Sequence, residues 1–336
     1  MHNSKKTIKS IICILIMLIV INTICLGGYY ETESQPYMDS KLREELAGNI
    51  DFIVIGASHA WNGFDTYVLD EKIPCNSYNL SNGLMPMEAR KQFIMNETAR
   101  NPVNTVVVEI TFDAMAGNAS EGMAAEGDEM AVARLGNNID RLKYMINNLS
   151  IDSAVSVYSR ALIRGVQAWA NILSGSKVLD REAKGFIRKS PNDMTVSETL
   201  NNIDKELIDT SKILDKNVTA LKEIIRFCKE NDIRIIMAVT PITNLSIKAS
   251  IHKDEFYKWL EDFSKEQACE FYDFNLLKNK QELFSDKTSF LDFGHLAEEG
   301  AKIFTNEFAT VINDVRDGKD VSDRFYTSYK EAYGVD

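Results

Sequence analysis

The stretch Asp51–His59, DFIVIGASH, joins a short apolar run to a glycine, a serine and a histidine. An apolar run of this length that ends in glycine is typical of a strand buried on both faces of a sheet. Similar runs recur along the chain, with helical patterns between them. The strands are predicted at 51–56, 77–80, 105–110, 233–239 and 269–274, and the helices at 86–100, 196–231, 253–267 and 298–315. This alternation predicts an α/β fold in which helices cover both faces of a roughly five-stranded parallel sheet.

The composition narrows the class of protein. Of the 336 residues, 45% are hydrophobic and 26% are charged, as expected for a chain that buries a substantial core. The net charge of −11 disfavours nucleic-acid binding, which requires a basic face. Beyond residue 30 the cysteines are Cys75, Cys228 and Cys269; we expect small buried side chains, although one disulfide stays open. No Cys-x-x-Cys, His-Glu-x-x-His or phosphate-binding loop occurs, so we expect neither a metal nor a cofactor.

The first 30 residues form a separate segment. Ser10–Leu26 contains no charged residue, and three lysines precede it. About 20 apolar residues span a bilayer, and the segment reaches that length at Tyr30. Because lysines favour the cytoplasmic side, the pattern predicts an uncleaved signal-anchor, a transmembrane helix of a single-pass cell-membrane protein with a cytoplasmic N-terminus and an extracytoplasmic domain. A cleaved signal peptide is the alternative, but no small-x-small cleavage motif lies near Gly27.

The remaining chain, residues 31–336, carries a net charge of −14, because residues 1–30 contain three lysines and no acidic residue. That charge favours solubility and disfavours adhesion to anionic lipid. The pattern of polar and apolar residues predicts four parts: a polar stalk with a short helix at 31–49, an α/β domain at 50–316, a helical insertion within that domain at 117–195, and a loosely docked polar tail at 317–336.

Polar residues that follow the strands are the candidates for chemistry, because ligands bind beyond the carboxyl ends of the strands in an open parallel sheet. Ser58 follows the first strand, and a serine acts as a nucleophile only with a base within hydrogen-bond reach. Asp292 precedes His295 by three residues, a spacing that lets a carboxylate orient the imidazole. Each motif alone is weak, and helix capping is the alternative role for Ser58 and for the Asp292–His295 pair.

Taken together, Gly-Ala-Ser at 56–58 and Asp-Phe-Gly-His at 292–295 resemble two blocks of the SGNH (GDSL-type) hydrolase superfamily. Residues 295–301, HLAEEGA, look like the segment that opens the last helix of that family. The resemblance spans residues 50–315 and implies a flavodoxin-like, three-layer α/β/α fold. It also implies that Ser58 is the nucleophile, His295 the base and Asp292 the group that orients the base.

The resemblance further implies an oxyanion hole made by the backbone N–H groups of Ser58 and Gly83, with Asn82 as the alternative donor. The third block of the family supplies an asparagine after the third strand, whereas this chain has Thr-Phe-Asp at 111–113. One donor is therefore missing or replaced, and the loss of one such donor costs about 10²–10³ in rate. Glu109, at the end of the third strand, is expected to pair or to face solvent. The candidate substrate contacts near these loops are His59, Trp61, Phe64 and Asp113.

The pattern looks similar to the membrane-anchored, extracytoplasmic branch of this superfamily that modifies cell-surface polymers. That branch includes the D-alanyl transfer protein of teichoic acid modification and the alginate O-acetylation proteins, which commonly act beside a membrane-bound O-acyltransferase. The resemblance implies a serine esterase or O-acyltransferase that carries an acyl group, preferably acetyl, through Ser58 to a glycan or polyol polymer. Two alternatives stay open. One is a catalytically weak scaffold that binds the polymer or the acyltransferase, which the missing asparagine favours; the other is a carbohydrate esterase that deacetylates.

Overall fold

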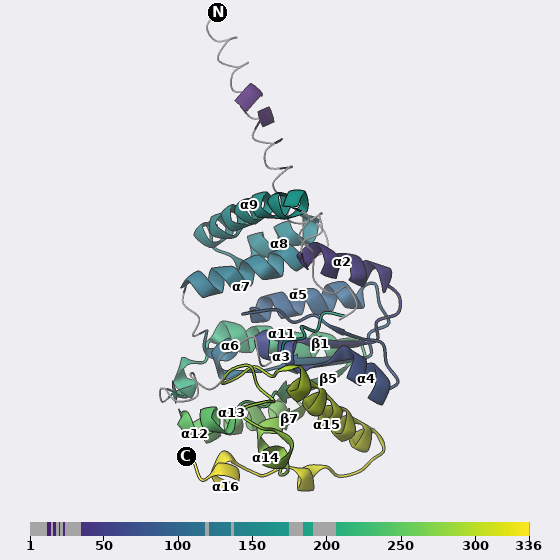
Figure 1. Ribbon diagram of the computed structural model, residues 1–336, viewed down its shortest axis with the longest axis vertical. Helices are drawn as coiled ribbons and strands as arrows, with labels where there is room; N and C mark the ends of the chain where they lie inside the picture. Colours follow the sequence, from purple (N-terminus) through teal and green to yellow (C-terminus); the bar gives the residue numbers. More distant parts are fainter. Residues whose placement is uncertain are drawn as a thin grey trace, which may run out of the picture. The chain divides into compact units, whose positions relative to one another are not determined.

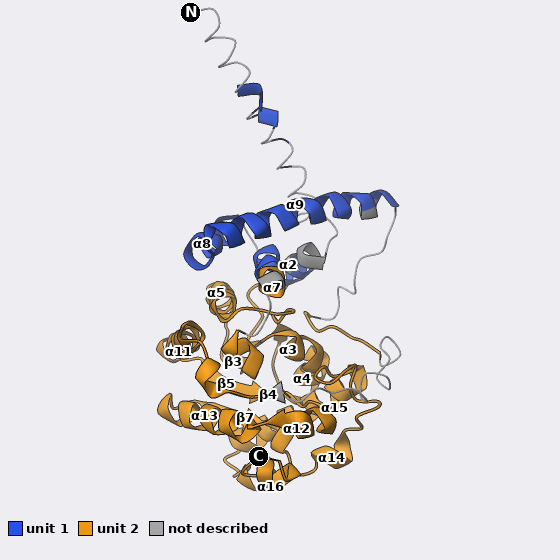
Figure 2. Cartoon of the chain, turned by 90° about the vertical axis from the view of Figure 1, so that its left-hand side faces the viewer, with its two compact units in different colours: residues 1–45, 128–181 blue, residues 46–127, 182–336 orange. Residues whose placement is uncertain are grey.

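The computed structural model describes residues 35–117, 121–135, 138–174, 184–190 and 206–335, with a few residues between 12 and 23. The chain divides into two compact units (Figure 2), residues 1–45 with 128–181 and residues 46–127 with 182–336. In their described parts, the first unit is helical, and the second contains the sheet and every residue predicted to take part in chemistry.

A five-stranded parallel sheet forms the centre of the second unit (Figure 1). In the order β2-β1-β3-β5-β7, its strands are Ser77–Asn79, Phe52–Ile55, Thr105–Glu109, Arg234–Val239 and Glu270–Asp273. Val54 of β1 lies opposite Asn79 of β2 and Val107 of β3. Strands β1 and β3 are buried along their whole length, which explains their nearly unbroken apolar sequences. The five predicted strands and the α/β class are confirmed.

Helices cover both faces of the sheet (Figure 2). One face carries α5 (Met87–Thr98), α11 (Asp215–Glu230) and α13 (Lys253–Glu266), and the other carries α3 (Ser58–Gly63), α4 (Thr66–Lys72) and α15 (Glu298–Arg316). On the first face, Lys91 of α5 pairs with Glu223 of α11 at 2.6 Å. On the second face, α15 packs directly against α3 and α4. The sheet therefore forms the middle of three layers.

Aromatic packing and one hydroxyl attach α15 to the turn between α3 and α4. The ring of Phe304 in α15 meets that of Phe64, with their centroids 4.7 Å apart. Directly beside this contact, the hydroxyl of the next residue, Thr305, accepts the N–H of Asp65 at 2.9 Å and donates to the carbonyl of Gly63 at 3.2 Å. Full burial of a phenylalanine side chain stabilises the folded state by about 1.5–3 kcal/mol relative to an exposed one. The last long helix is thus joined firmly to the helix that begins at residue 58.

The helix predicted at 196–231 begins later than expected, because α11 starts at Asp215. Before it lie the short strand β4 (Glu206–Leu207), which pairs with β6 (Ser250–Ile251), and the short helix η3 (Thr210–Lys212). The Asp209 carboxylate accepts the N–H of Ser211 at 3.1 Å, so a local turn replaces the helix there. Residues 191–205 lie outside the described part of the chain.

The first unit contains α2 (Gln35–Glu45), the end of α7 (Glu121–Arg134), α8 (Asn138–Asn148) and α9 (Ile151–Ser174). The last three helices fall within the segment 117–195 predicted as an insertion, and the boundaries of that insertion stay a prediction. Phe186, in contrast, belongs to the hydrophobic core of the second unit. The described residues 184–190 of the predicted insertion therefore run along the α/β unit.

The predicted stalk contains the expected short helix, α2, but that helix is not an exposed spacer. Asp39 of α2 pairs with Arg134 of α7 at 2.6 Å, and Arg43 is buried. Among the described residues, no helix is both long enough and apolar enough to cross a membrane. The anchor predicted at Ser10–Leu26 lies largely outside the described residues.

The tail at 317–336 was expected to be loosely docked, and this prediction is wrong. Its described residues pack onto the α/β unit through the short helices η5 (Ser322–Arg324) and α16 (Tyr329–Tyr333). Tyr329 is buried, and its hydroxyl donates to Asp273 at 2.6 Å. Burial raises the pKa of Asp273, and the hydrogen bond from Tyr329 opposes that rise. The tail is polar on average, but its buried tyrosine attaches it to the α/β unit.

Replacing Tyr329 with phenylalanine removes one hydrogen bond to a buried carboxylate and keeps the ring. We expect the free energy of unfolding of the full chain, measured by urea titration, to fall by about 1–3 kcal/mol. Tyr326→Phe is the control, because that ring is only half-buried and the change is expected to cost little. Equal stability of wild type and Tyr329→Phe would show that this contact does not hold the tail.

Candidate active site

Ser58, His295 and Asp292 form one hydrogen-bonded chain. Ser58 Oγ lies 2.7 Å from His295 Nε2. On the other side of the ring, His295 Nδ1 lies 2.7 Å and 2.9 Å from the two carboxylate oxygens of Asp292. Ser58 and His295 are 237 residues apart in the sequence, so the fold alone brings them together. The order is that of a nucleophile, a base and an orienting carboxylate.

The charge on Asp292 fixes the proton positions in this chain. Burial alone raises the pKa of Asp292, but the hydrogen bond and charge of His295 and the N–H groups of Gly294 and His295 outweigh it and lower the pKa to about 2. At neutral pH this carboxylate is ionised and only accepts hydrogen bonds. His295 Nδ1 therefore carries a hydrogen and donates to Asp292. Its Nε2 is left to accept the hydrogen of the Ser58 hydroxyl.

A tight turn between β1 and α3 presents Ser58. Strand β1 ends at Ile55, and α3 begins at Ser58 itself. The glycine at position 56 is required by space, since a Cβ there would lie 2.6 Å from the Cβ of Ala60 and 2.7 Å from that of Glu109. Ala57, which lies between Gly56 and Ser58, donates its N–H to Glu109 Oε2 at 3.1 Å. The backbone that carries the serine is therefore fixed from below.

Glu109 was expected to pair or to face solvent, but it is fully buried beneath this turn. Burial raises the pKa of Glu109, and the charge of Arg90 opposes the rise. Arg90 is also buried, and it donates to the backbone carbonyl of Glu109. One feature of the sequence could have marked this residue, since Glu109 is the single charged residue in an otherwise largely apolar strand. In the sheet it directly follows Val108, which lies opposite Ile55 of β1.

The loop that carries Asp292 and His295 is closed on itself and held by its neighbours. The N–H of Leu291 donates to the carbonyl of His295 at 2.8 Å. Between them, the carbonyl of Phe293 accepts the N–H of Thr243 at 3.1 Å and the hydroxyl of Ser246 at 3.0 Å. The loop after β5 thus anchors the loop before α15, which limits the movement of the His295 ring.

His59 was a candidate substrate contact, and the structure places its ring against the His295 ring instead. The two rings meet edge to face with centroids 4.8 Å apart. The His59 ring has space beside Gly294 because that residue has no side chain; a Cβ there would lie 2.8 Å from His59 Cε1. Burial, and then the positive charge of His295, lower the pKa of His59 to about 3. His59 is therefore a neutral neighbour of the His295 imidazole at neutral pH.

Asn82 and Gly83 lie in the loop that follows β2, the strand that pairs with β1. Asn82 is only 1% exposed, and neither its amide nitrogen nor its amide oxygen has a hydrogen-bond partner among the described residues. An unsatisfied polar group in the interior is costly. This buried amide is therefore available to donate a hydrogen bond to a bound ligand. The role of Asn82 and Gly83 in an oxyanion hole stays a prediction.

The other predicted contacts lie in different surroundings. Phe64 is fully buried in the aromatic cluster under α15, so it exposes no surface to a substrate. Trp61 is half-buried, and its carbonyl accepts the N–H of Ile187 at 3.2 Å. Asp113 is exposed in the first turn of α6 (Phe112–Ala116). Thr111, where the family has its asparagine nearby, caps that helix by accepting the N–H of Ala114 at 3.3 Å.

The described residues contain no group of three or more His, Cys, Asp or Glu side chains that could hold a metal ion. Cys75, Cys228 and Cys269 are free thiols, of which Cys228 is buried and the other two are partly buried. Burial raises the pKa of Cys228 to about 12 and that of Cys269 to about 11. These thiols are therefore poor nucleophiles at neutral pH.

Comparisons with known proteins give limited matches. One protein-family model matches residues 192–316, less than half of the chain. No curated protein matches the sequence. A solved structure of a protein named as a lipolytic member of the G-D-S-L family, from Desulfitobacterium hafniense DCB-2, is 11% identical with a TM-score of 0.37, covering 78% of this chain and 99% of its own. A protein named as an acylhydrolase, from Bacteroides fragilis NCTC 9343, is 12% identical with a TM-score of 0.34, covering 82% of this chain and 94% of its own. Both neighbours are named as hydrolases, but likeness at this level assigns no role to a residue of this chain.

The neutral state of His59 predicts a pH dependence of stability. The folded-state pKa of about 3 lies below the ordinary value of 6.5, so the unfolded chain binds an extra proton between these pH values. The contribution of neutral His59 is fully present above pH 6.5 and is lost as the pH falls towards 3. We expect His59→Gln to flatten the fall in unfolding free energy between about pH 6.5 and 3, measured by denaturant titration at several pH values.

His252→Gln is the matched control for this measurement, because His252 is exposed on the surface of the same unit. It should leave the slope of stability against pH close to that of the wild type. An unchanged slope in His59→Gln would contradict the neutral state assigned to His59.

Proposed function

We propose that this chain is a serine esterase or O-acyltransferase of the SGNH type that works through an acyl group on Ser58. One observation carries the proposal: Ser58 Oγ, the His295 ring and the Asp292 carboxylate form a continuous hydrogen-bonded chain. The helix-capping alternative for Ser58 does not account for this chain, since a capping serine has no need of an oriented imidazole.

In the first step, Ser58 Oγ attacks the carbonyl carbon of an ester, and His295 Nε2 takes the hydroxyl proton. The charge that forms on the imidazole is stabilised by Asp292, which stays ionised. The tetrahedral intermediate then loses its alkoxide, which receives the proton from His295. The products of this step are a free alcohol and an ester of Ser58.

In the second step, a hydroxyl group attacks the acyl-Ser58 ester. His295 takes the proton of that hydroxyl and returns it to Ser58 Oγ as the bond to the serine breaks. Water as the attacking group gives hydrolysis, and a sugar or polyol hydroxyl gives acyl transfer. The acceptor therefore depends on how well the bound site excludes water.

For substrate and location, we propose an acetyl group and a cell-surface glycan or polyol polymer outside the membrane. The uncharged segment Ser10–Leu26 behind three lysines supports an N-terminal anchor. The resemblance of residues 56–58 and 292–295 to the anchored branch of the superfamily supports the polymer and a membrane-bound O-acyltransferase as partner. The acidic charge of residues 31–336 favours a soluble domain at that surface.

Labelling with a fluorescent fluorophosphonate tests the nucleophile. We expect the full chain to be labelled at Ser58, Ser58→Ala to give no label, and Asp292→Asn to label about 10³–10⁴-fold more slowly because the imidazole loses its orientation. His252→Gln is the control, because His252 pairs with Glu255 at 2.8 Å through the same spacing of three residues but lies outside the triad. No labelling of the folded wild type would contradict the proposal and favour the scaffold alternative.

The unpartnered amide of Asn82 predicts a separation between rate and stability. If the amide donates to the oxyanion, Asn82→Ala lowers kcat for a small ester by about 10²–10³. The same change removes no hydrogen bond seen in this structure, so we expect the unfolding free energy to change by less than about 1 kcal/mol. Asn79→Ala is the contrasting variant, because the Asn79 amide donates to two backbone carbonyls and its loss costs stability. An unaltered kcat in Asn82→Ala would exclude this donor.

A further inference from the structure

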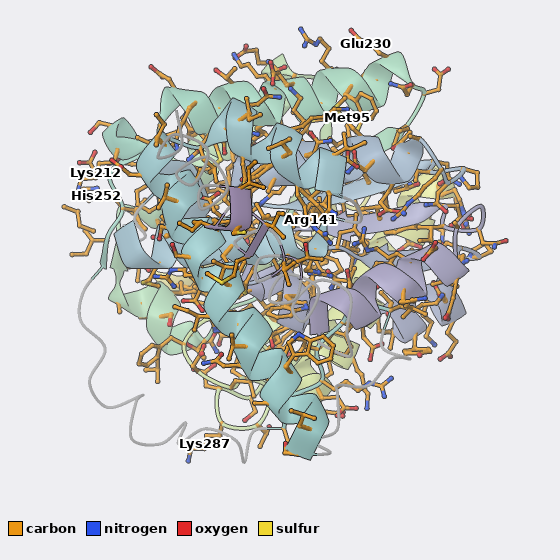
Figure 3. The ribbon with its side chains drawn as sticks, turned by 90° about the horizontal axis from the view of Figure 1, so that it is seen from above. Met95, Arg141, Lys212, Glu230, His252 and Lys287 are labelled. Atoms are coloured by element: carbon orange, nitrogen blue, oxygen red, sulfur yellow. The ribbon has the colours of Figure 1, made fainter. Side chains whose placement is uncertain are left out.

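The helix α9 exposes an apolar stripe along its whole length. Its members recur at helical spacing, and the most exposed, Ile151 and Leu173 at the two ends, are 83% and 86% exposed. Figure 3 shows the side chains that project from this helix, which crosses the foreground. At 24 residues, the helix is about 36 Å long. The other exposed members of the stripe are Val155, Tyr158, Val166 and Trp169.

This stripe is not the face that holds α9 within its own unit. Val157 and Ala161 are fully buried, and they lie on another side of the helix. The stripe continues onto α8, where Leu142 and Ile146 are more than half exposed. An apolar groove lined by residues of both helices, including Leu142 and Val155, joins the two faces. A contiguous exposed apolar surface of this kind marks a binding surface.

We infer that the α8–α9 hairpin, residues 138–174, lies in the headgroup interface of a lipid bilayer with its apolar stripe against the acyl chains. Residues 138–174 carry four basic and two acidic residues, whereas residues 31–336 as a whole carry a net charge of −14. A locally basic, amphipathic pair of helices suits an anionic lipid surface. Tyr158 and Trp169 belong to the stripe, and their rings favour the interface between water and hydrocarbon.

The chain itself brings this hairpin close to the predicted anchor. Eight residues separate Leu26 from the start of α2 at Gln35, a span of at most about 30 Å when extended. Within the first unit, α2 is tied to α7 by the Asp39–Arg134 pair. Helix α9 is tied to α7 by the pair of Arg164 and Glu129 at 2.7 Å, and α8 by the hydrogen bond from Tyr144 to Asp128 at 2.9 Å.

This inference goes beyond the proposed chemistry and rests only on its membrane anchor. A second copy of the chain is the main competing occupant, but it would bring two surfaces of the same positive sign together. A membrane protein partner would also cover the stripe. Both competitors would exclude lipid from the stripe, which is what the experiment measures.

The full chain is placed in nanodiscs of phosphatidylethanolamine and phosphatidylglycerol that contain a lipid with a photoreactive diazirine on its acyl chain. After irradiation, lipid adducts are mapped by peptide mass spectrometry. We expect adducts on residues 1–30 and, in addition, on Val155, Val166 and Leu173. Leu245, which is 42% exposed in the second unit, serves as the reference for a lone exposed apolar residue and should stay unlabelled.

The double variant Val155→Ser/Val166→Ser changes two side chains that are each 58% exposed, so the fold is expected to survive. It should lose most of the adducts on α9 and keep those on residues 1–30, and Leu245→Ser should change neither. Adducts confined to residues 1–30, with or without a dimer seen by mass photometry, would overturn the inference, and so would a complete absence of adducts. Adducts on α9 would support it whether or not Ser58 reacts with a fluorophosphonate, so the two proposals fail separately.

Discussion

The packing of α15 against α3 and α4 is the interaction on which the site depends. Ser58 is the first residue of α3, and His295 lies just before α15. The contact of Phe64 with Phe304 and the two hydrogen bonds of Thr305 join these helices. Without that joint, a hydrogen bond between residues 237 positions apart has no support. Because a displacement of about 1 Å can lower the rate of positioned groups by about 10², this packing is a condition of the proposed chemistry.

The surroundings of the site give its ionisable groups different states. Asp292, bonded to His295 and to two backbone N–H groups, stays charged, and it can stabilise an imidazolium. Burial raises the pKa of Glu109, and that side chain supports the backbone at Ala57. His59 stays neutral, so in the proposed mechanism His295 alone takes up a positive charge. Opposite shifts of neighbouring groups are typical of sites that separate these tasks.

The strands are predictable from the sequence, and so is the contact between Asp292 and His295, because both follow from local rules. Buried parallel strands read as apolar runs, and Asp292 and His295 share one short loop with a recognisable spacing. Features that depend on distant contacts are not predictable in this way. Glu109 was expected to pair or to face solvent, and only its place beside Gly56 decides between the two. The tail looks polar and mobile, yet Tyr329 meets a carboxylate 56 positions away in the sequence.

An acyl group held on Ser58 is the central claim, and trapping it is the most direct measurement. The full chain is mixed with p-nitrophenyl acetate, quenched in acid after a few milliseconds to seconds, and digested for mass spectrometry. The account predicts an acetyl group on the peptide that contains Ser58, and none on that peptide in Ser58→Ala. An acetyl group that forms on other residues at the same rate in both proteins, with none on Ser58, would contradict it.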